Sequence, residues 1–273
     1  MILSLRDRSF SHSPVSNGPM PPLSGIMSPI EWDRVTPVTK DTIYTDAEIF
    51  FAPKDTGAIA WTIEPIAGRE DAYEFLVKRA PEFREVWTHD RRLLEMIPNG
   101  RFVPFGGCWI APVDRKIWPK TKGISTIASN KRGGIGYDMR HEAIKRFPQI
   151  DAYGIEYTPL AHKIDALRDY RFQLVIENVR ADWWFTEKLI DCFMTGTVPI
   201  YWGCPSIGKF FDNRGIIPIE GIEDLHNLLN IMAGIEEDLY MKAAQFIADN
   251  FERAKRYCLT EDYIARNILG VDK

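Results

Sequence analysis

The sequence predicts an α/β protein made of two lobes, and three observations support this class. Its 273 residues exceed what one compact core usually holds. Short apolar segments alternate with amphipathic ones along the chain, as in layered folds that pack helices on parallel strands. A polar segment with a proline, residues 114–123, separates two such series. We therefore expect lobes at residues 1–115 and 116–273, with a cleft between them.

The first lobe is expected to alternate strands and helices after a short N-terminal strand. Residues 11–37 are rich in Pro, Ser and Gly, which predicts a long loop. The helix expected at 69–80 places four apolar residues on one face: Tyr73, Leu76, Val77 and Ala80. The strand segments are 1–5, 47–52, 57–63, 83–90 and part of 98–112, and a second short helix is expected at 91–97.

The second lobe repeats this alternation and ends in a largely helical tail at 236–269. Gly196 follows the helix pattern of 186–195, at the position where a left-handed residue costs least. The expected strands are 124–129, 150–154, 171–178, 197–203 and 215–221, and the other expected helices are 136–147, 162–170 and 222–232.

The composition narrows the class of protein. A formal net charge of −4 argues against a general nucleic-acid-binding protein, which normally carries a basic surplus. No run of about 18 apolar residues predicts a membrane span, and the apolar N-terminal stretch is too short for a signal peptide. We expect a cytoplasmic protein, bacterial or viral, and the sequence does not indicate an oligomeric state. Four cysteines in no zinc-binding spacing are interpreted as reduced, packed thiols: Cys108, Cys192, Cys204 and Cys258.

The segment from Phe172 to Gly203 places many polar side chains where a strand ends and a helix begins. In open α/β sheets, ligands bind beyond the carboxyl ends of strands, against helix N-termini that favour anions. Thr186 is placed to cap the helix, and Lys188 in its first turn needs a compensating anion, which a diphosphate would supply. Glu187 is placed to accept hydrogen bonds from ribose hydroxyls.

Three aromatic residues in the same segment offer faces for a base or a sugar. They are Trp183, Trp184 and Phe185, directly before the helix. The alternative interpretation is an ordinary solvated helix start with aromatic packing beneath it. The constellation as a whole favours the ligand-binding interpretation.

These residues resemble the family 10 glycosyltransferases, the α-1,3/1,4-fucosyltransferases. The pattern FxLVIEN followed by TEKLIDCFxTGTVPIYWG carries the resemblance. It implies two Rossmann-like lobes of the GT-B type, with the acceptor bound by residues 1–115 and the donor by residues 116–273. It also implies GDP-fucose as donor and inversion at the anomeric carbon.

Carried over residue by residue, the resemblance places Asn178, Trp184, Glu187 and Lys188 on donor-binding positions. Position 184 is usually Tyr in this motif, so Trp184 keeps a stacking face but lacks the phenol hydroxyl.

A second anion-binding element precedes this segment. Glycines at 133, 134 and 136 follow a strand and open a helix, which lets backbone N–H groups approach an anion closely. Arg140 on that helix can reach a phosphate with two hydrogen bonds, and family members have an Arg on this helix that holds the diphosphate. Lys131 is a further donor-binding candidate, and Arg132 is held in reserve.

An inverting transfer needs a base to remove the proton of the acceptor hydroxyl. Glu64 ends an apolar strand directly before a proline and is the expected catalytic base, because family members place a Glu in a similar context. His89 and Asp90 are alternatives, and His12 in the long loop could line the cleft.

No Asp-x-Asp sequence occurs, so no protein metal site is expected. We expect that no cofactor is required. Whether a divalent cation stimulates the reaction is left open. The leading hypothesis is an inverting glycosyltransferase moving fucose from GDP-fucose to a glycan hydroxyl, so the expected partners are a nucleotide sugar and a glycan acceptor. The alternatives are a transferase using another nucleotide sugar and a catalytically inactive protein that binds nucleotide sugars or glycans.

Overall fold

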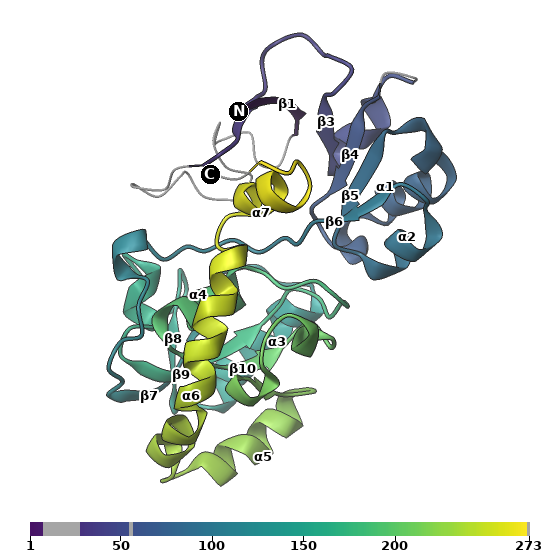
Figure 1. Ribbon diagram of the computed structural model, residues 1–273. Coiled ribbons are helices and arrows are strands. Elements are labelled where there is room, and N and C mark those ends of the chain that lie inside the picture. The colour runs from purple at the N-terminus through teal and green to yellow at the C-terminus, as the bar shows by residue number, and fades with distance from the viewer. Residues whose placement is uncertain (8–27, 55–56, 272–273) are drawn as a thin grey trace. The chain divides into compact units, whose positions relative to one another are not determined.

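The computed structural model describes residues 1–7, 28–54 and 57–271, which form two compact units (Figure 1). Each unit is a wholly parallel sheet covered by helices, so the predicted α/β class is confirmed. Unit 1 comprises Met1–Gly107, Ala181–Trp184 and the chain from Leu259 onward, and unit 2 comprises Cys108–Arg180 and Phe185–Cys258.

Unit 1 is built on a six-stranded sheet in the order β2-β1-β3-β4-β5-β6. Its strands are β1 (Ile2–Arg6), β2 (Glu31–Asp33), β3 (Ile43–Thr45), β4 (Ile59–Thr62), β5 (Glu85–Thr88) and β6 (Gly100–Phe102). Its helices are α1 (Ile66–Arg79), α2 (Arg91–Met96) and α7 (Thr260–Asn267), with 3-10 turns η1 (Asp46–Phe51) and η2 (Ala80–Glu82).

Alternation along β4 divides the core of unit 1 into two layers. Ile59 and Trp61 pack into a cluster that also contains residues of α7, while Ala60 joins the cluster under α1 and α2. This alternation is the two-residue period of a strand buried on both faces. Figure 1 shows α7 on the opposite side of this sheet from α1 and α2.

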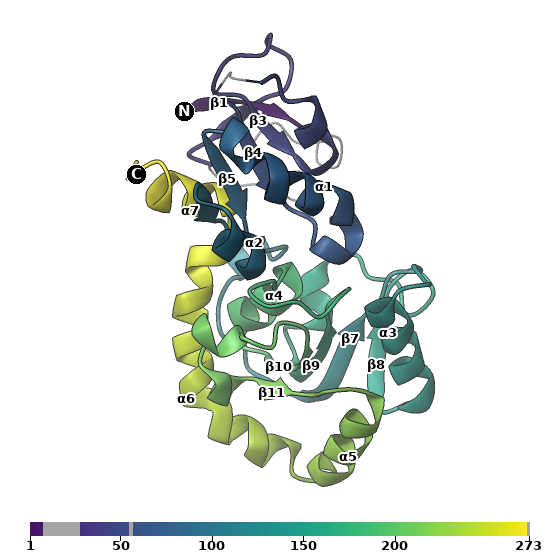
Figure 2. The ribbon, with the colours of Figure 1, turned by 90° about the vertical axis from the view of Figure 1, so that its right-hand side faces the viewer.

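Unit 2 is built on a five-stranded sheet in the order β11-β10-β9-β7-β8, which Figure 2 shows in this sequence. Its strands are β7 (Lys122–Ile127), β8 (Ile150–Tyr153), β9 (Tyr170–Ile176), β10 (Val198–Trp202) and β11 (Ile217–Pro218). Its helices are α3 (Ile135–Arg146), α4 (Glu187–Thr195), α5 (Ile222–Met232) and α6 (Glu236–Ala254). Its 3-10 turns are η3 (Pro112–Asp114), η4 (Lys163–Ala166), η5 (Ile207–Lys209), η6 (Asn213–Gly215) and η7 (Lys255–Tyr257).

Two sequence predictions about local structure are wrong. Residues 47–52 form most of η1 instead of a strand, and only Ile49 of its apolar residues is fully buried. A short apolar run does not distinguish a strand from a helical turn. The helix expected at 162–170 is only the short turn η4, because β9 already begins at Tyr170.

The predicted loop at 11–37 and the predicted lobe boundary also need adjustment. Residues 8–27 lie outside the described part of the chain, but 31–33 form β2. The units divide after Gly107 instead of after residue 115, and α7 belongs to unit 1. The reason is packing, because Ile264 and Ala265 of α7 are buried in one cluster with Leu5.

Two further properties bear on the class of protein. All four cysteines are buried thiols without a disulfide, as the sequence indicated. Among the described helices, none combines the length and the apolar character that crossing a membrane requires.

Candidate functional site

The candidate site lies in unit 2, where α3 and α4 begin beside the carboxyl end of β9. Gly136 in the first turn of α3 donates its N–H to the carbonyl oxygen of Asn178 at 3.2 Å. A Cβ atom at Gly136 would lie 1.8 Å from the carbonyl oxygen of Glu177, so only glycine allows this approach. The chain is therefore built to bring a helix N-terminus directly against the end of a strand.

The start of α4 is fixed by a buried carboxylate. Thr186 is the N-cap, and its Oγ1 accepts a hydrogen bond from the N–H of Lys188 at 3.3 Å, as predicted. Glu177 is fully buried and accepts from Thr186 through its backbone N–H at 2.9 Å and its hydroxyl at 2.8 Å. Gly196 ends the helix in the left-handed region with φ of 75°. Both predicted ends of this helix are confirmed.

Lys188 points back toward the strand end, where two carboxylates surround it. Its Nζ lies 3.3 Å from Oε2 of Glu177 and 3.4 Å from Oε1 of Glu187, and it donates to Oγ1 of Thr186 at 3.0 Å. Burial alone would lower the pKa of Lys188, but the two carboxylates outweigh burial and raise it. The sequence assigned the compensating anion to a ligand, whereas in this structure the protein supplies it.

Glu187 faces a second lysine that the sequence analysis missed. Lys163 Nζ lies 3.8 Å from Oε1 of Glu187 and 2.6 Å from Oδ2 of Asp191. Burial would raise the pKa of Glu187, but Lys188 and Lys163 reverse this and hold it below its ordinary value. Asp191 is fully buried and its Oδ1 accepts from the backbone N–H of Trp109 at 2.7 Å.

Arg140 is anchored on the end of β9 from the α3 side. Its Nε donates to the carbonyl oxygen of Ile176 at 2.9 Å, and its Nη2 donates to Oδ1 of Asn178 at 2.6 Å. The side chain is buried, and burial lowers its pKa although Glu177 opposes this. Within the described residues Nη1 makes no hydrogen bond, so one edge of the guanidinium is available to an anion.

The two basic residues before α3 lie at the surface. The ammonium of Lys131 is exposed and 5.8 Å from the ring centroid of Tyr137. Arg132 is also exposed and forms an ion pair with Glu156 at 2.5 Å. Both side chains are exposed, in contrast to the buried and anchored Arg140.

The aromatic residues before α4 differ from the sequence interpretation. Phe185 is fully buried and packs against Phe211, so it cannot stack on a ligand. Trp184 is only 2% exposed and packs within unit 1, against His89 and Phe105. Its Nε1 is buried and makes no hydrogen bond to a described residue. Its donor-binding role stays a prediction, but its ring faces are covered by protein in this structure.

Glu64 belongs to unit 1, whereas the donor-binding candidates Arg140, Asn178, Glu187 and Lys188 belong to unit 2. Its peptide is held from both sides, since its N–H donates to Oδ1 of Asp46 at 3.3 Å and its carbonyl accepts from the hydroxyl of Tyr73 at 3.1 Å. Asp46 is buried with φ of 42°, and burial together with Glu64 raises its pKa to about 7.

The two alternative bases, His89 and Asp90, are a buried side chain and a helix cap. His89 is 2% exposed, and burial lowers its pKa to about 3. Asp90 caps α2, where its carboxylate accepts from the N–H of Leu93 at 2.8 Å. His12 lies outside the described residues. Of these candidates, Glu64 is the one without a capping or fully buried role.

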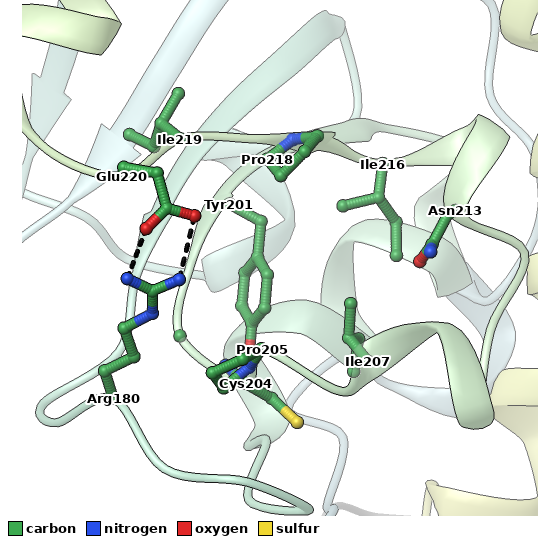
Figure 3. Close-up of a pocket in the computed structure, with 11 residues that line it drawn as sticks. Arg180, Tyr201, Cys204, Pro205, Ile207, Asn213, Ile216, Pro218, Ile219 and Glu220 are labelled. Atoms are coloured by element: carbon green, nitrogen blue, oxygen red, sulfur yellow. Dashed lines mark hydrogen bonds and ion pairs between the residues drawn. The ribbon is translucent and has the colours of Figure 1, made fainter.

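A cavity of about 210 Å³ opens at the carboxyl ends of β10 and β11 in unit 2 (Figure 3). Its wall combines apolar and polar surface, and the paired side chains of Arg180 and Glu220 lie at one side. The sequence analysis missed it because the wall is formed by residues from three separate segments, at 180, 201–207 and 213–220. The lining residues are Arg180, Tyr201, Gly203, Cys204, Pro205, Ile207, Asn213, Ile216, Pro218, Ile219 and Glu220.

Lys163 and Asp191 are the functional candidates that sequence reasoning did not find. Asp191 follows Glu187 by one helical turn in an otherwise apolar stretch, and this spacing was the available signal. Lys163 carried no such signal, because η4 is brought to α4 only by the tertiary fold. In the described part of the chain, no group of three or more His, Cys, Asp or Glu side chains is arranged to hold a metal ion.

Solved structures share the fold. A crystal structure of an α1,3-fucosyltransferase with GDP aligns with a TM-score of 0.56 and 16% identity, covering 86% of this chain and 81% of that chain. A structure of the same kind of enzyme with GDP-fucose has a TM-score of 0.51 and 15% identity, covering 89% and 83%. The structure of TarM has a TM-score of 0.53 at 13% identity, covering 84% of this chain and 54% of that one.

Sequence relatives point to the same family. An α-(1,3)-fucosyltransferase of Helicobacter pylori is 32% identical over 117 residues, which are 41% of this chain and 24% of that protein. A 3-galactosyl-N-acetylglucosaminide 4-α-L-fucosyltransferase of Bos taurus is 26% identical over 154 residues, 50% of this chain and 40% of that protein. The matches thus span less than half the length of these relatives. The model of the C-terminal part of glycosyltransferase family 10 (fucosyltransferase) matches residues 117–253, half of the chain, and the protein belongs to this family.

Proposed function

We propose that this protein transfers fucose from GDP-fucose to a hydroxyl of a glycan, with inversion at the anomeric carbon. The observation that carries the proposal is the pair of cations at the end of β9. Arg140 in the second turn of α3 donates to Asn178, and Lys188 in the first turn of α4 pairs with Glu177. Family membership and the fold shared with fucosyltransferase structures containing GDP and GDP-fucose support the choice of donor.

In this proposal the cations bind the diphosphate and stabilise the leaving GDP. Arg140 offers Nη1 while the carbonyl of Ile176 and the amide of Asn178 orient its guanidinium. Lys188 exchanges part of its contact with Glu177 and Glu187 for phosphate oxygens. The N-terminus of α4 adds its dipole, so negative charge developing on the leaving group meets fixed positive charge.

The remaining roles follow from charge. Glu187, ionised because its pKa is lowered, accepts hydrogen bonds from ribose hydroxyls. Glu64 removes the proton of the acceptor hydroxyl while the bond between the anomeric carbon and the phosphate oxygen breaks on the opposite face of the sugar. The proton passes to Glu64, and the bonding electrons leave with GDP. No metal ion is required in this scheme, and Lys131 on the exposed loop adds general attraction for the donor.

Calorimetric titration with GDP-fucose, GDP, GDP-mannose and UDP-glucose, with and without EDTA, tests the donor. We expect GDP-fucose and GDP to bind, independently of EDTA. If only UDP-glucose binds, the proposal of a glycosyltransferase stands and the proposal of GDP-fucose as donor fails. If no nucleotide binds, the donor-site proposal fails.

Transfer is tested with a 3-galactosyl-N-acetylglucosamine acceptor, chosen because the bovine relative is named for this substrate. Proton NMR of the product gives the anomeric configuration, and a retained configuration would contradict inversion. Donor binding without transfer to any acceptor tried, and without hydrolysis of GDP-fucose, would favour a protein that only binds the nucleotide sugar.

A further inference from the structure

Five charged side chains of unit 2 form a chain of alternating sign beside the start of α4. Neighbours are joined in the order Asp191, Lys163, Glu187, Lys188 and Glu177, with N–O distances of 2.6, 3.8, 3.4 and 3.3 Å. Each lysine therefore lies between two carboxylates. Of these five side chains, the proposed donor site uses Glu187, Lys188 and Glu177. Lys163 and Asp191 have no role in it.

All five groups are withdrawn from water to a large extent. The side chains of Asp191 and Glu177 are fully buried, and those of Lys163, Glu187 and Lys188 are 13%, 11% and 23% exposed. Buried charges are tolerated only when they are paired, so removing one member leaves its neighbours uncompensated. The charge states of the five side chains are therefore coupled to one another.

Lys163 is held firmly on the side away from Glu187. Its ammonium lies 2.6 Å from Asp191 and 4.7 Å from the ring centroid of Trp109. Asp191 is itself fixed, because the backbone N–H of Trp109 donates to it at 2.7 Å. Lys163 is thus a cation whose position is set by the fold.

Binding of a diphosphate changes the demand on Lys163. When the ammonium of Lys188 contacts phosphate oxygens, it compensates the negative charge of Glu187 less. The other cations facing Glu187 are Lys163 on η4 and Arg140 on α3, and Arg140 would itself contact the phosphate. Lys163 is then the cation that keeps a buried Glu187 ionised.

We propose that Lys163 is a positioning residue of the donor site: fixed by Asp191 and Trp109, it keeps the Glu187 carboxylate charged and aimed at the ribose hydroxyls of the nucleotide. This inference rests on the function proposed above and deepens it. It assigns a role in donor binding to a residue that does not itself contact the donor.

The pH dependence of binding follows from the groups around Glu187. These are Lys188 and Asp191 on α4, Lys163 on η4 and Arg140 on α3. Burial raises the pKa of Glu187 while Lys188 and Lys163 lower it, so removing Lys163 raises this pKa. Affinity for GDP requires the ionised carboxylate. When the pH is lowered, the variant should therefore lose this affinity at a higher pH than the wild type does.

The test compares three variants, Lys163→Met, Lys163→Arg and the double variant Lys163→Met/Asp191→Asn. GDP affinity is measured by calorimetry from about pH 5.5 to 8, and thermal unfolding is followed in parallel. Lys163→Met should bind GDP about tenfold more weakly at neutral pH because the Glu187 carboxylate is no longer held in place, and the loss should grow as the pH falls. Lys163→Arg should recover most of this loss because it keeps the charge.

The double variant separates positioning from stability. It removes the buried charge that Lys163→Met alone leaves unpaired on Asp191, so it should regain thermal stability and fold even if the single variant does not. GDP affinity should nevertheless stay low, with the pH profile still shifted upward. If the double variant instead binds GDP as the wild type does at every pH, Lys163 serves only to neutralise Asp191 and the inference is overturned.

A nucleotide without ribose hydroxyls gives a second readout. Wild-type protein should prefer GDP to 2′,3′-dideoxy-GDP, and this preference should shrink about tenfold in the double variant. An unchanged preference would contradict the link through Glu187. Wild-type protein that binds neither nucleotide would overturn the proposed function together with this inference, whereas wild-type binding with unaffected variants would overturn this inference alone.

Discussion

A glutamate follows the carboxyl end of both β4 and β9 within two residues, but the surroundings of the two glutamates have opposite electrostatic character. Beyond β9, Glu177 is surrounded by donors and cations, with Thr186 and Lys188 in direct contact. Beyond β4, Glu64 lies next to a second carboxyl group, that of Asp46. In the proposed function, the first arrangement serves the binding of an anion and the second serves proton transfer.

The difference arises in the segments that come directly after the two strands. After β9 the chain makes a capped helix, α4, whose first turn supplies Lys188. After β4 a proline comes immediately after Glu64, and the adjacent strand β3 delivers Asp46 beneath it. Each group raises the cost of ionising the other, and burial raises the pKa of Asp46 to about 7.

The largest effect is expected from removing the charge at the β4 end. Glu64→Gln should lower fucose transfer by roughly two to four orders of magnitude, the usual contribution of a general base, with GDP affinity unchanged. The measurement is the transfer rate at saturating donor, and Glu70→Gln on the exposed side of α1 is the matched control. If the transfer rate of Glu64→Gln is unchanged, Glu64 is not the catalytic base.

The packing at the β9 end can be broken by one methyl group. In Gly136→Ala the new Cβ would meet the carbonyl oxygens of Glu177 and Asn178, at 1.8 and 2.8 Å. We expect a loss of about 3 kcal/mol or more in the free energy of unfolding, measured with urea. Gly123→Ala, where a Cβ meets no atom within 4 Å, should be nearly neutral. Equal stabilities would show that α3 can move away from β9.

Lys188→Ala tests the cationic character of the β9 end directly. Losing a charge-assisted contact to phosphate should weaken GDP binding about a hundredfold. Calorimetry measures the affinity, and Lys145→Ala on the exposed face of α3 should bind as the wild type does. Equal losses in both variants would indicate general attraction instead of a specific site.

An effect that appears only as the pH changes is expected from the second carboxyl group at the β4 end. The pKa of Asp46 is about 7 in the folded protein against an ordinary 3.8, so its contribution to stability is complete below about pH 4 and is lost as the pH rises through 7. Asp46→Asn removes this titration but keeps an acceptor for the N–H of Ile63.

Relative to wild type, Asp46→Asn should therefore gain about 3–4 kcal/mol in the free energy of unfolding between pH 4 and 8. Urea unfolding at both pH values measures the gain. A constant difference across this range would mean that Asp46 is already ionised at low pH, and the two strand ends would then differ less than described.

The sequence predicts much of the β9 end because the signals there are local. A strand ending in Glu-Asn, the Thr186 cap and the Gly196 terminus each depend on neighbours a few residues away. The same holds for most strands and helices. In contrast, β2 and β3 have three residues each, too few for a periodic pattern.

Features that depend on distant segments could not be read from the sequence. Lys163 reaches Asp191 only through the fold, and Trp184 is covered by His89 and Phe105 from elsewhere in unit 1. An aromatic residue before a helix is equally compatible with ligand stacking and with burial. Local chemistry is therefore predictable here, whereas the partners of each side chain are not.

The placement of α7 in unit 1 has a consequence for how the chain is made. Ile264 and Ala265 complete a core with Leu5 and Trp32, and the indole of Trp32 donates to Glu261 at 2.9 Å. During synthesis, residues 1–107 therefore leave the ribosome with an apolar layer uncovered, which only residues synthesised after 259 can close. Unit 2 has its own complete core by Cys258, so it is able to finish folding before unit 1 does.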